Sequence, residues 1–148
     1  MKAVLTIMAV LAGVVAFGVS MATADVIPLK VTLRDDQCTR TTDNAVNCTG
    51  SLSGLGSQTT FVTVSSGFQC MNRGGNNPPG QVSGESGAIQ PDKSGNASFN
   101  VTTNAASCPD QMTPIFTGTQ ACPGQAQIDV TQEFANRSKT TTFCVPIT

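Results

Sequence analysis

Short segments of alternating apolar and polar residues, turn-forming residues between them and six cysteines predict an all-β fold with three disulfides. Residues 25–148 of the 148-residue chain are rich in Thr, Ser, Gly and Asn, and no helical spacing of apolar residues among them extends beyond one turn. Seven or eight short strands in a chain of this length favour an antiparallel, immunoglobulin-like β-sandwich. A small β-barrel is the alternative.

The N-terminal segment has the composition of a secretory signal peptide. Met1-Lys2 gives a positive start, residues 3–19 are predominantly apolar, and Ala22-Thr23-Ala24 offers small residues at a cleavage site before Asp25. An uncleaved anchor helix is the alternative, for which the apolar run is somewhat short. We therefore expect residues 1–24 to be removed and residues 25–148 to form one secreted, extracellular domain without a membrane span.

The expected strands are segments of period-two pattern or β-branched composition, separated by clusters of Gly, Pro, Asn and Asp. Alternation is clearest in two of them: Val62 and Val64 against Phe61 and Thr63, and Ile128 and Val130 against Gln127 and Asp129. The predicted strands cover residues 26–33, 45–52, 59–70, 87–89, 97–103, 113–119, 125–134 and 140–145.

All six cysteines follow the expected cleavage site, at Cys38, Cys48, Cys70, Cys108, Cys122 and Cys144. An even number in an exported chain indicates a disulfide framework. Six cysteines allow about 15 connectivities, among which the count does not decide. A metal site would need paired Cys or His ligands, and the chain has neither a Cys-x-x-Cys pair nor a histidine, so we expect no metal.

Residues 71–81, MNRGGNNPPGQ, form the most conspicuous predicted loop. Its Gly-Gly and Pro-Pro steps disfavour regular structure and limit the freedom of the chain. Loops of this size often carry function, so Arg73, Asn76 and Asn77 are candidate contacts to a partner. A tolerated insertion without a partner is the alternative.

Composition excludes several function classes. Without histidine, the Ser-His-Asp and Cys-His nucleophile systems cannot form, and without Trp or Tyr the chain lacks the usual aromatic platforms of glycosidases. Beyond Lys2 the chain carries seven basic and nine acidic residues, which disfavours a nucleic-acid partner. The Asp35-Asp36 pair has no surrounding calcium-loop pattern and reads as solvated charge near a strand end. We expect no cofactor and no catalysis.

Four Asn-x-Ser/Thr sequons occur, at Asn47, Asn96, Asn100 and Asn136. Roughly two would arise by chance in a chain of this composition, so the excess is small. In a eukaryotic source, Asn96 and Asn136 would be the better glycosylation acceptors because both lie on predicted turns.

Six phenylalanines lie in predicted strands and are interpreted as core residues, namely Phe61, Phe68, Phe99, Phe116, Phe134 and Phe143. Burial of one such side chain contributes about 1.5 to 3 kcal/mol, so they form a modest core together with Val and Ile. Disulfides supplement such a core by constraining the unfolded chain.

Several segments together resemble a group of small, uncharacterised exported bacterial β-domain proteins. The matching segments are residues 38–56 (CTRTTDNAVNCTGSLSGLG), 70–81 (CMNRGGNNPPGQ), 95–103 (GNASFNVTT) and 108–110 (CPD). The shared pattern is a Cys-closed hairpin leading to Gly-Leu-Gly, a strand that ends in Cys before a Gly-Gly-Asn loop, and a later Cys-Pro segment. The resemblance implies an exported β domain and carries no activity or site residues.

The same resemblance implies a disulfide pairing. Cys38 and Cys48 would close the hairpin, Cys70 and Cys108 would belong to the shared pattern, and the additional Cys122 and Cys144 would pair with each other.

These observations predict a secreted, non-catalytic binding or surface domain. A secreted hydrolase inhibitor that presents Arg73 from the loop at residues 71–81 is one alternative. A carrier of a small apolar ligand, comparable with antibiotic-carrying sandwiches, is another and would need an apolar cavity between the sheets.

Overall fold

The computed structural model describes residues 30–71, 74 and 78–148, and the expected signal peptide lies outside these ranges. The described residues form eight strands: β1 (Thr32–Arg40), β2 (Val46–Ser53), β3 (Thr60–Cys70), β4 (Pro79–Glu85), β5 (Ala97–Thr102), β6 (Pro114–Phe116), β7 (Gln125–Phe134) and β8 (Arg137–Pro146). A single 3-10 turn, η1 (Pro109–Gln111), precedes β6. This part of the chain contains no helix with the length and apolar character needed to cross a membrane.

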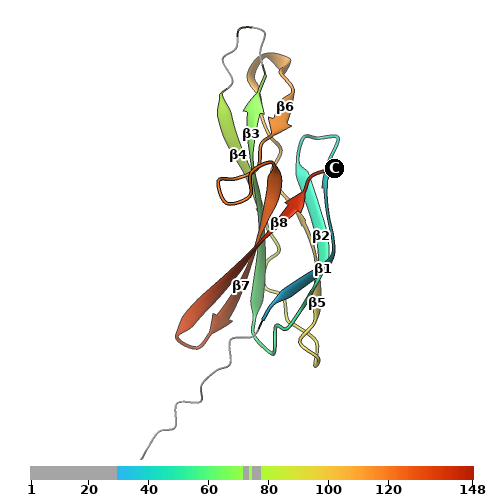
Figure 1. The fold of residues 1–148 in the computed structure, drawn as a ribbon, viewed down its shortest axis with the longest axis vertical. Coiled ribbons are helices and arrows are strands. Elements are labelled where there is room, and N and C mark those ends of the chain that lie inside the picture. The colour runs from blue at the N-terminus through green and yellow to red at the C-terminus, as the bar shows by residue number, and fades with distance from the viewer. Residues whose placement is uncertain (1–29, 72–73, 75–77) are drawn as a thin grey trace, which may run out of the picture.

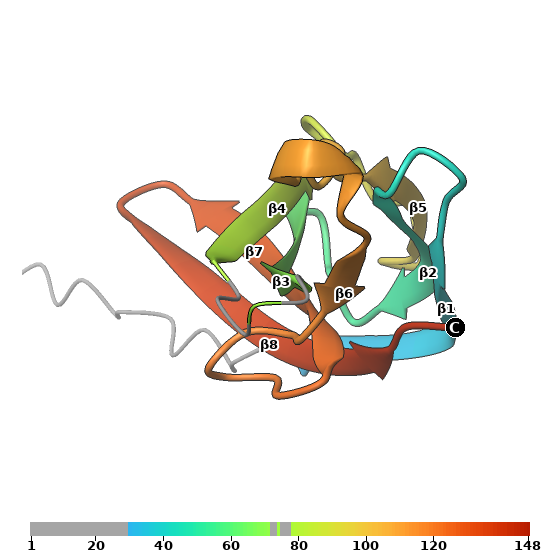
Figure 2. The ribbon, with the colours of Figure 1, turned by 90° about the horizontal axis from the view of Figure 1, so that it is seen from above.

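The strands form two antiparallel sheets that face each other. One sheet has the order β1-β2-β5 and the other the order β4-β3-β7-β8, with β6 paired to the end of β3 beyond β7. Figure 1 shows the sheets side by side along the long axis, and Figure 2 shows them enclosing a common interior. The predicted all-β sandwich is therefore confirmed.

Inward-facing side chains of both sheets form the core. Alternate residues of β3 and β7 are buried, which is the pattern that the sequence predicts for these segments. Leu52 from one sheet packs in the same cluster as Val64 and Ile128 from the other, and none of the three is exposed by more than 1%. The buried Gln132 donates from Nε2 to the carbonyl oxygen of Leu55 at 3.0 Å, so its amide is satisfied inside the core.

The phenylalanines divide between core and surface, which corrects the prediction for two of them. Phe68 and Phe99 are buried in the core, and Phe116 and Phe143 pack against it at its margin. Phe61 and Phe134 lie outside this cluster. Phe61 alternates with the buried Thr60 and Val62, so it shares the outward face of β3 with polar side chains.

Backbone contacts also join the two sheets along their sides. On one side Ile147 forms a parallel bridge to Cys38, and the Thr148 amide donates to the Cys38 carbonyl at 2.9 Å. Figure 2 shows this end of the chain beside β1. On the other side the Asn104 amide donates to the Ser83 carbonyl at 3.0 Å. These contacts cover part of the edges of β1 and β4, where the sheets would otherwise be open to pairing with another chain.

Strand β4 replaces the strand that we predicted at residues 87–89, and it shortens the loop predicted at 71–81. Of its seven residues only Val82 is buried, so its extended form follows from pairing with β3 and not from its own pattern. Pro79 is tolerated there because it opens a strand at the edge of the sheet. Ile89, which suggested the strand, makes only an isolated bridge to Thr60.

The Asp35-Asp36 pair lies inside β1 and not near its end. The register of β1 on β2 shifts between Arg34 and Gln37, and Asp35 has a φ of 50°. Both aspartates are exposed. The pair therefore forms a charged β-bulge, a feature that discourages pairing at an open strand edge.

Three disulfides reinforce the sandwich, and no cysteine of the described residues is free. Cys38–Cys48 joins opposite residues of β1 and β2, Cys70–Cys108 joins the end of β3 to the residue before η1, and Cys122–Cys144 joins the segment before β7 to β8. This is the pairing that the resemblance implies. Three disulfides in a domain of this size are typical of extracellular proteins.

Candidate functional site

The predicted partner residues Arg73, Asn76 and Asn77 lie outside the described residues. The described flanks of their loop are Met71, whose exposed fraction is 54%, and the exposed Pro78. The Cys70–Cys108 disulfide anchors the base of the loop at the end of β3.

The sequon asparagines differ in their surroundings. Asn96 precedes β5 and Asn136 lies in the two-residue turn between β7 and β8, and both are exposed. Asn47 is half-buried, and its Nδ2 donates to Asn100 Oδ1 at 2.7 Å and to Thr102 Oγ1 at 2.8 Å. The amide of Asn47 is therefore engaged in the sheet, whereas no such bond holds Asn96 or Asn136 among the described residues.

The outer face of the five-stranded sheet contains a polar hollow that the sequence analysis did not identify. We name it the outer groove, and its volume is ≈ 700 Å³. It is lined by Thr63 and Ser65 of β3, Gln81 and Ser83 of β4, Gln127 and Asp129 of β7, and Thr119, Gln120 and Ala121 of the segment before β7. The strands form its floor and residues 119–121 form a wall.

Glycines bring the wall close to the sheet. The Gly67 amide donates to the Gly118 carbonyl at 2.9 Å, and a Cβ atom at Gly67 would collide with that carbonyl oxygen. Gly118 has a φ of 72°, in the left-handed region that glycine adopts without strain. The chain then turns back, because the Gly124 amide donates to the Thr117 carbonyl at 2.8 Å. These glycines therefore allow residues 117–124 to form a compact turn directly before the first residue of β7.

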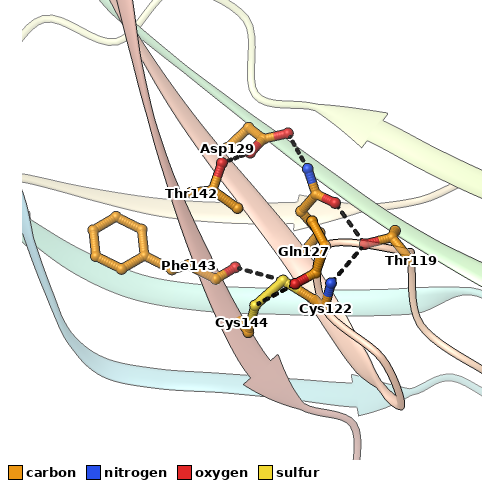
Figure 3. The surroundings of a disulfide bond; sticks show 8 residues. Thr119, Cys122, Gln127, Asp129, Thr142, Phe143 and Cys144 are labelled. Atoms are coloured by element: carbon orange, nitrogen blue, oxygen red, sulfur yellow. Dashed lines mark hydrogen bonds between the residues drawn. A yellow bond between two sulfur atoms is a disulfide. The ribbon is translucent and has the colours of Figure 1, made fainter.

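A chain of hydrogen bonds connects this wall to the floor (Figure 3). The Cys122 amide donates to Thr119 Oγ1 at 3.1 Å, and Thr119 Oγ1 donates to Gln127 Oε1 at 2.5 Å. Gln127 Nε2 donates to Asp129 Oδ2 at 2.7 Å, and Thr142 Oγ1 donates to Asp129 Oδ1 at 2.6 Å. Each carboxylate oxygen thus accepts one bond, and the orientation of the Gln127 amide is fixed by its two partners.

Other polar groups of the outer groove have no such partners. The hydroxyls of Thr63, Ser65 and Ser83 and the amide of Gln81 form no hydrogen bond with another side chain or backbone group in the described part of the chain. Ser65 is 9% exposed as a residue, and no side-chain N or O atom that is itself buried among the described residues lacks a partner. An accessible hydroxyl without a protein partner retains its hydrogen-bonding capacity for a molecule in the groove.

Two further hollows lie elsewhere on the described residues. One, of ≈ 650 Å³, extends from Arg34 and Asp35 to Asp92 and Asn96, and the other surrounds the turn before β5. Asp92 Oδ1 accepts hydrogen bonds from the amides of Ser94 and Asn96, both at 2.8 Å. Its carboxylate therefore stabilises its own turn, as aspartate commonly does, and the outer groove is the stronger candidate.

Among the described residues, no group of three or more Cys, His, Asp or Glu is placed to hold a metal ion. The outer groove supplies hydrogen-bond donors and acceptors, with Asp129 as the charged side chain in its lining.

The polar residues of β7 were the available sequence signal for this site, because Gln127 and Asp129 alternate with buried apolar residues.

No protein-family model matches the chain, and no curated protein shows significant similarity to it.

Proposed function

We propose that the protein is a secreted, non-catalytic binding domain and that the outer groove is its binding site. One observation carries the proposal: oriented groups of Gln127 and Asp129 lie beside the unpartnered hydroxyls of Ser65 and Ser83. Specific binding sites commonly combine a preformed hollow with a few fixed polar groups. Because the hydrogen bonds that orient Gln127 and Asp129 are made within the protein itself, little order would have to be gained on binding.

Export is part of the proposal. The signal-like segment at residues 1–24 and the three disulfides both support it. The immunoglobulin-like class is also proposed, supported by the strand orders β1-β2-β5 and β4-β3-β7-β8. In the second of these sheets, β4 lies beside β3 at the edge, where variable-type immunoglobulin domains have an additional strand.

The two alternative functions have less support. An inhibitor would depend on Arg73, outside the described residues. A carrier of apolar ligands would need an apolar cavity between the sheets, whereas the outer groove lies on the outer face of one sheet, and all its lining residues except Ala121 carry a hydroxyl, amide or carboxylate group.

The proposal is tested by blocking the groove. A library of small polar compounds is screened by heteronuclear NMR, and we expect shifts of hits to concentrate on Thr63, Ser65 and Gln127. Ser83→Trp should abolish these shifts because the indole would block access to Ser65 and Gln127, which lie in the same row of the sheet. Ser138→Trp, on the same sheet face but outside the groove lining, is the matched control and should leave them unchanged. Hits that cluster elsewhere, or that persist in folded Ser83→Trp, would refute the site.

A further inference from the structure

We infer that the outer groove takes a neutral, polyhydroxylated ligand, a saccharide chain, laid across β4, β3 and β7. This inference rests on the proposed function and adds the chemical class of the ligand. Three features of the outward sheet face carry it: a regular array of hydroxyl and amide groups, carboxylates without any Lys or Arg among the described outward positions, and one aromatic side chain beside the polar array.

The strand register arranges the polar groups in rows. Ser83, Ser65 and Gln127 are opposite one another across β4, β3 and β7. The neighbouring row continues through Glu85, Thr63, Asp129 and Thr142. Strands lie about 4.8 Å apart, and outward residues along one strand are about 6.8 Å apart. A ligand with hydroxyls distributed along its length can bond several members of such a grid at once, whereas a compact ligand with one polar group cannot.

The charge of this face selects against anions. Its outward strand positions include three carboxylates, those of Glu85, Asp129 and Glu133, and none of the described ones is Lys or Arg. Arg137 and Lys139 alternate to the opposite face of β8. Sulfated or phosphorylated ligands would meet uncompensated negative charge. Each oxygen of Asp129 already accepts one hydrogen bond, which fixes its orientation and leaves one lone pair on each oxygen for a hydroxyl donor of the ligand.

Phe61 supplies an apolar surface on the same face. It is half-buried, two residues from Thr63 along β3, and opposite Thr131 of β7. A sugar ring presents apolar C–H groups as well as hydroxyls, so an aromatic ring beside hydrogen-bonding groups matches both. The position of Phe61 outside the core cluster has no packing explanation of the kind that accounts for Phe68 and Phe99.

The test is isothermal titration calorimetry of the full disulfide-bonded domain. Three kinds of probe are used: neutral oligosaccharides of glucose, xylose, mannose and N-acetylglucosamine, a sulfated oligosaccharide, and a lysine oligopeptide. We expect at least one neutral oligosaccharide to bind with little dependence on salt, because no charge is neutralised. Ser83→Trp should abolish this binding, and Phe61→Ala should weaken it about fivefold through lost apolar contact. Ser138→Trp should bind like the unmodified protein, and thermal melting verifies that each variant is folded.

The outcomes separate the inference from the proposed function. Failure of every neutral oligosaccharide to bind would overturn the inference. So would preference for the sulfated probe, or salt-sensitive binding of the lysine peptide alone. In these cases the NMR screen tests whether the outer groove binds a ligand at all. Hits that shift groove residues would retain the proposed binding function with another class of ligand. The absence of such hits would refute both the saccharide inference and the proposed function.

Discussion

Removal of the Cys122–Cys144 disulfide tests both the stability of the sandwich and the origin of the groove wall. Cys122 is fully buried, so alanine is the suitable replacement there, since a serine hydroxyl would be buried without a partner. Cys144 is exposed and can become serine. The bridge spans a sequence separation of 22, for which the loop-closure entropy gives about 3.4 kcal/mol at room temperature. We expect the free energy of unfolding of Cys122→Ala/Cys144→Ser to fall by about that amount.

The expected loss of unfolding free energy can be compared with the losses expected for the other two disulfides of the same domain. The same relation gives about 3.9 kcal/mol for the separation of 38 between Cys70 and Cys108, and about 2.7 kcal/mol for the separation of 10 between Cys38 and Cys48. Urea unfolding of the three double variants, with alanine at every buried cysteine, which includes both Cys38 and Cys48, measures the order directly. A loss below about 1 kcal/mol for Cys122→Ala/Cys144→Ser would refute the entropic reasoning for this bridge.

The wall should loosen in the same variant without unfolding. Its backbone bonds remain, including the amides of Cys122 and Gly124 that donate to Thr119 and Thr117. With the covalent tie removed, hydrogen exchange at residues 122 and 124 should become faster than exchange in the centre of β3. Unchanged exchange at these amides would show that the hydrogen bonds alone hold the wall.

Three further substitutions have defined outcomes. Gly67→Ala should destabilise the domain by about 1 to 3 kcal/mol in urea unfolding, because the added methyl group meets the Gly118 carbonyl, and a neutral result would show that the wall moves freely. Gln132→Leu should cost about 0.5 to 1.5 kcal/mol by removing one of the two hydrogen bonds that the Leu55 carbonyl accepts, the other coming from the Gln58 amide at 3.4 Å, and calorimetric melting that matches the unmodified protein would contradict this. Asp35→Gly should raise stability by up to about 1 kcal/mol, because Asp35 has a φ of 50°, and a lowered melting temperature would mean that its charge or side-chain contacts matter more.

Strands β3 and β7 were predictable because each presents one face to the core, so the period of burial is visible in the sequence. The same pattern did not show whether Phe61 or Val62 faces the core, since apolar residues occupy both faces of β3. Which face is covered depends on the position of the other sheet. Strand β4 was missed because its residues carry little β-propensity and it is held by pairing with a strand distant in sequence.

The outer groove was only partly visible in the sequence for a related reason. The polar face of β7 is visible in the sequence alone, because polar and apolar residues alternate along this strand. The groove also needs Ser65 from β3, Ser83 from β4 and the wall around Thr119, which become neighbours only in the folded sheet. The register that aligns Ser83, Ser65 and Gln127 is a property of long-range pairing, and no spacing along the chain encodes it directly.

The contact between Thr148 and β1 has a consequence for the timing of folding. Cys38 and Thr148 are 110 residues apart in the chain, yet the backbone amide and hydroxyl of Thr148 bond the Cys38 carbonyl at 2.9 and 3.3 Å. The part of the β1 edge at Cys38 is therefore covered by a segment from the far end of the described chain. A contact between residues so distant in sequence carries a large loop-closure entropy, so we expect this contact to form late in folding.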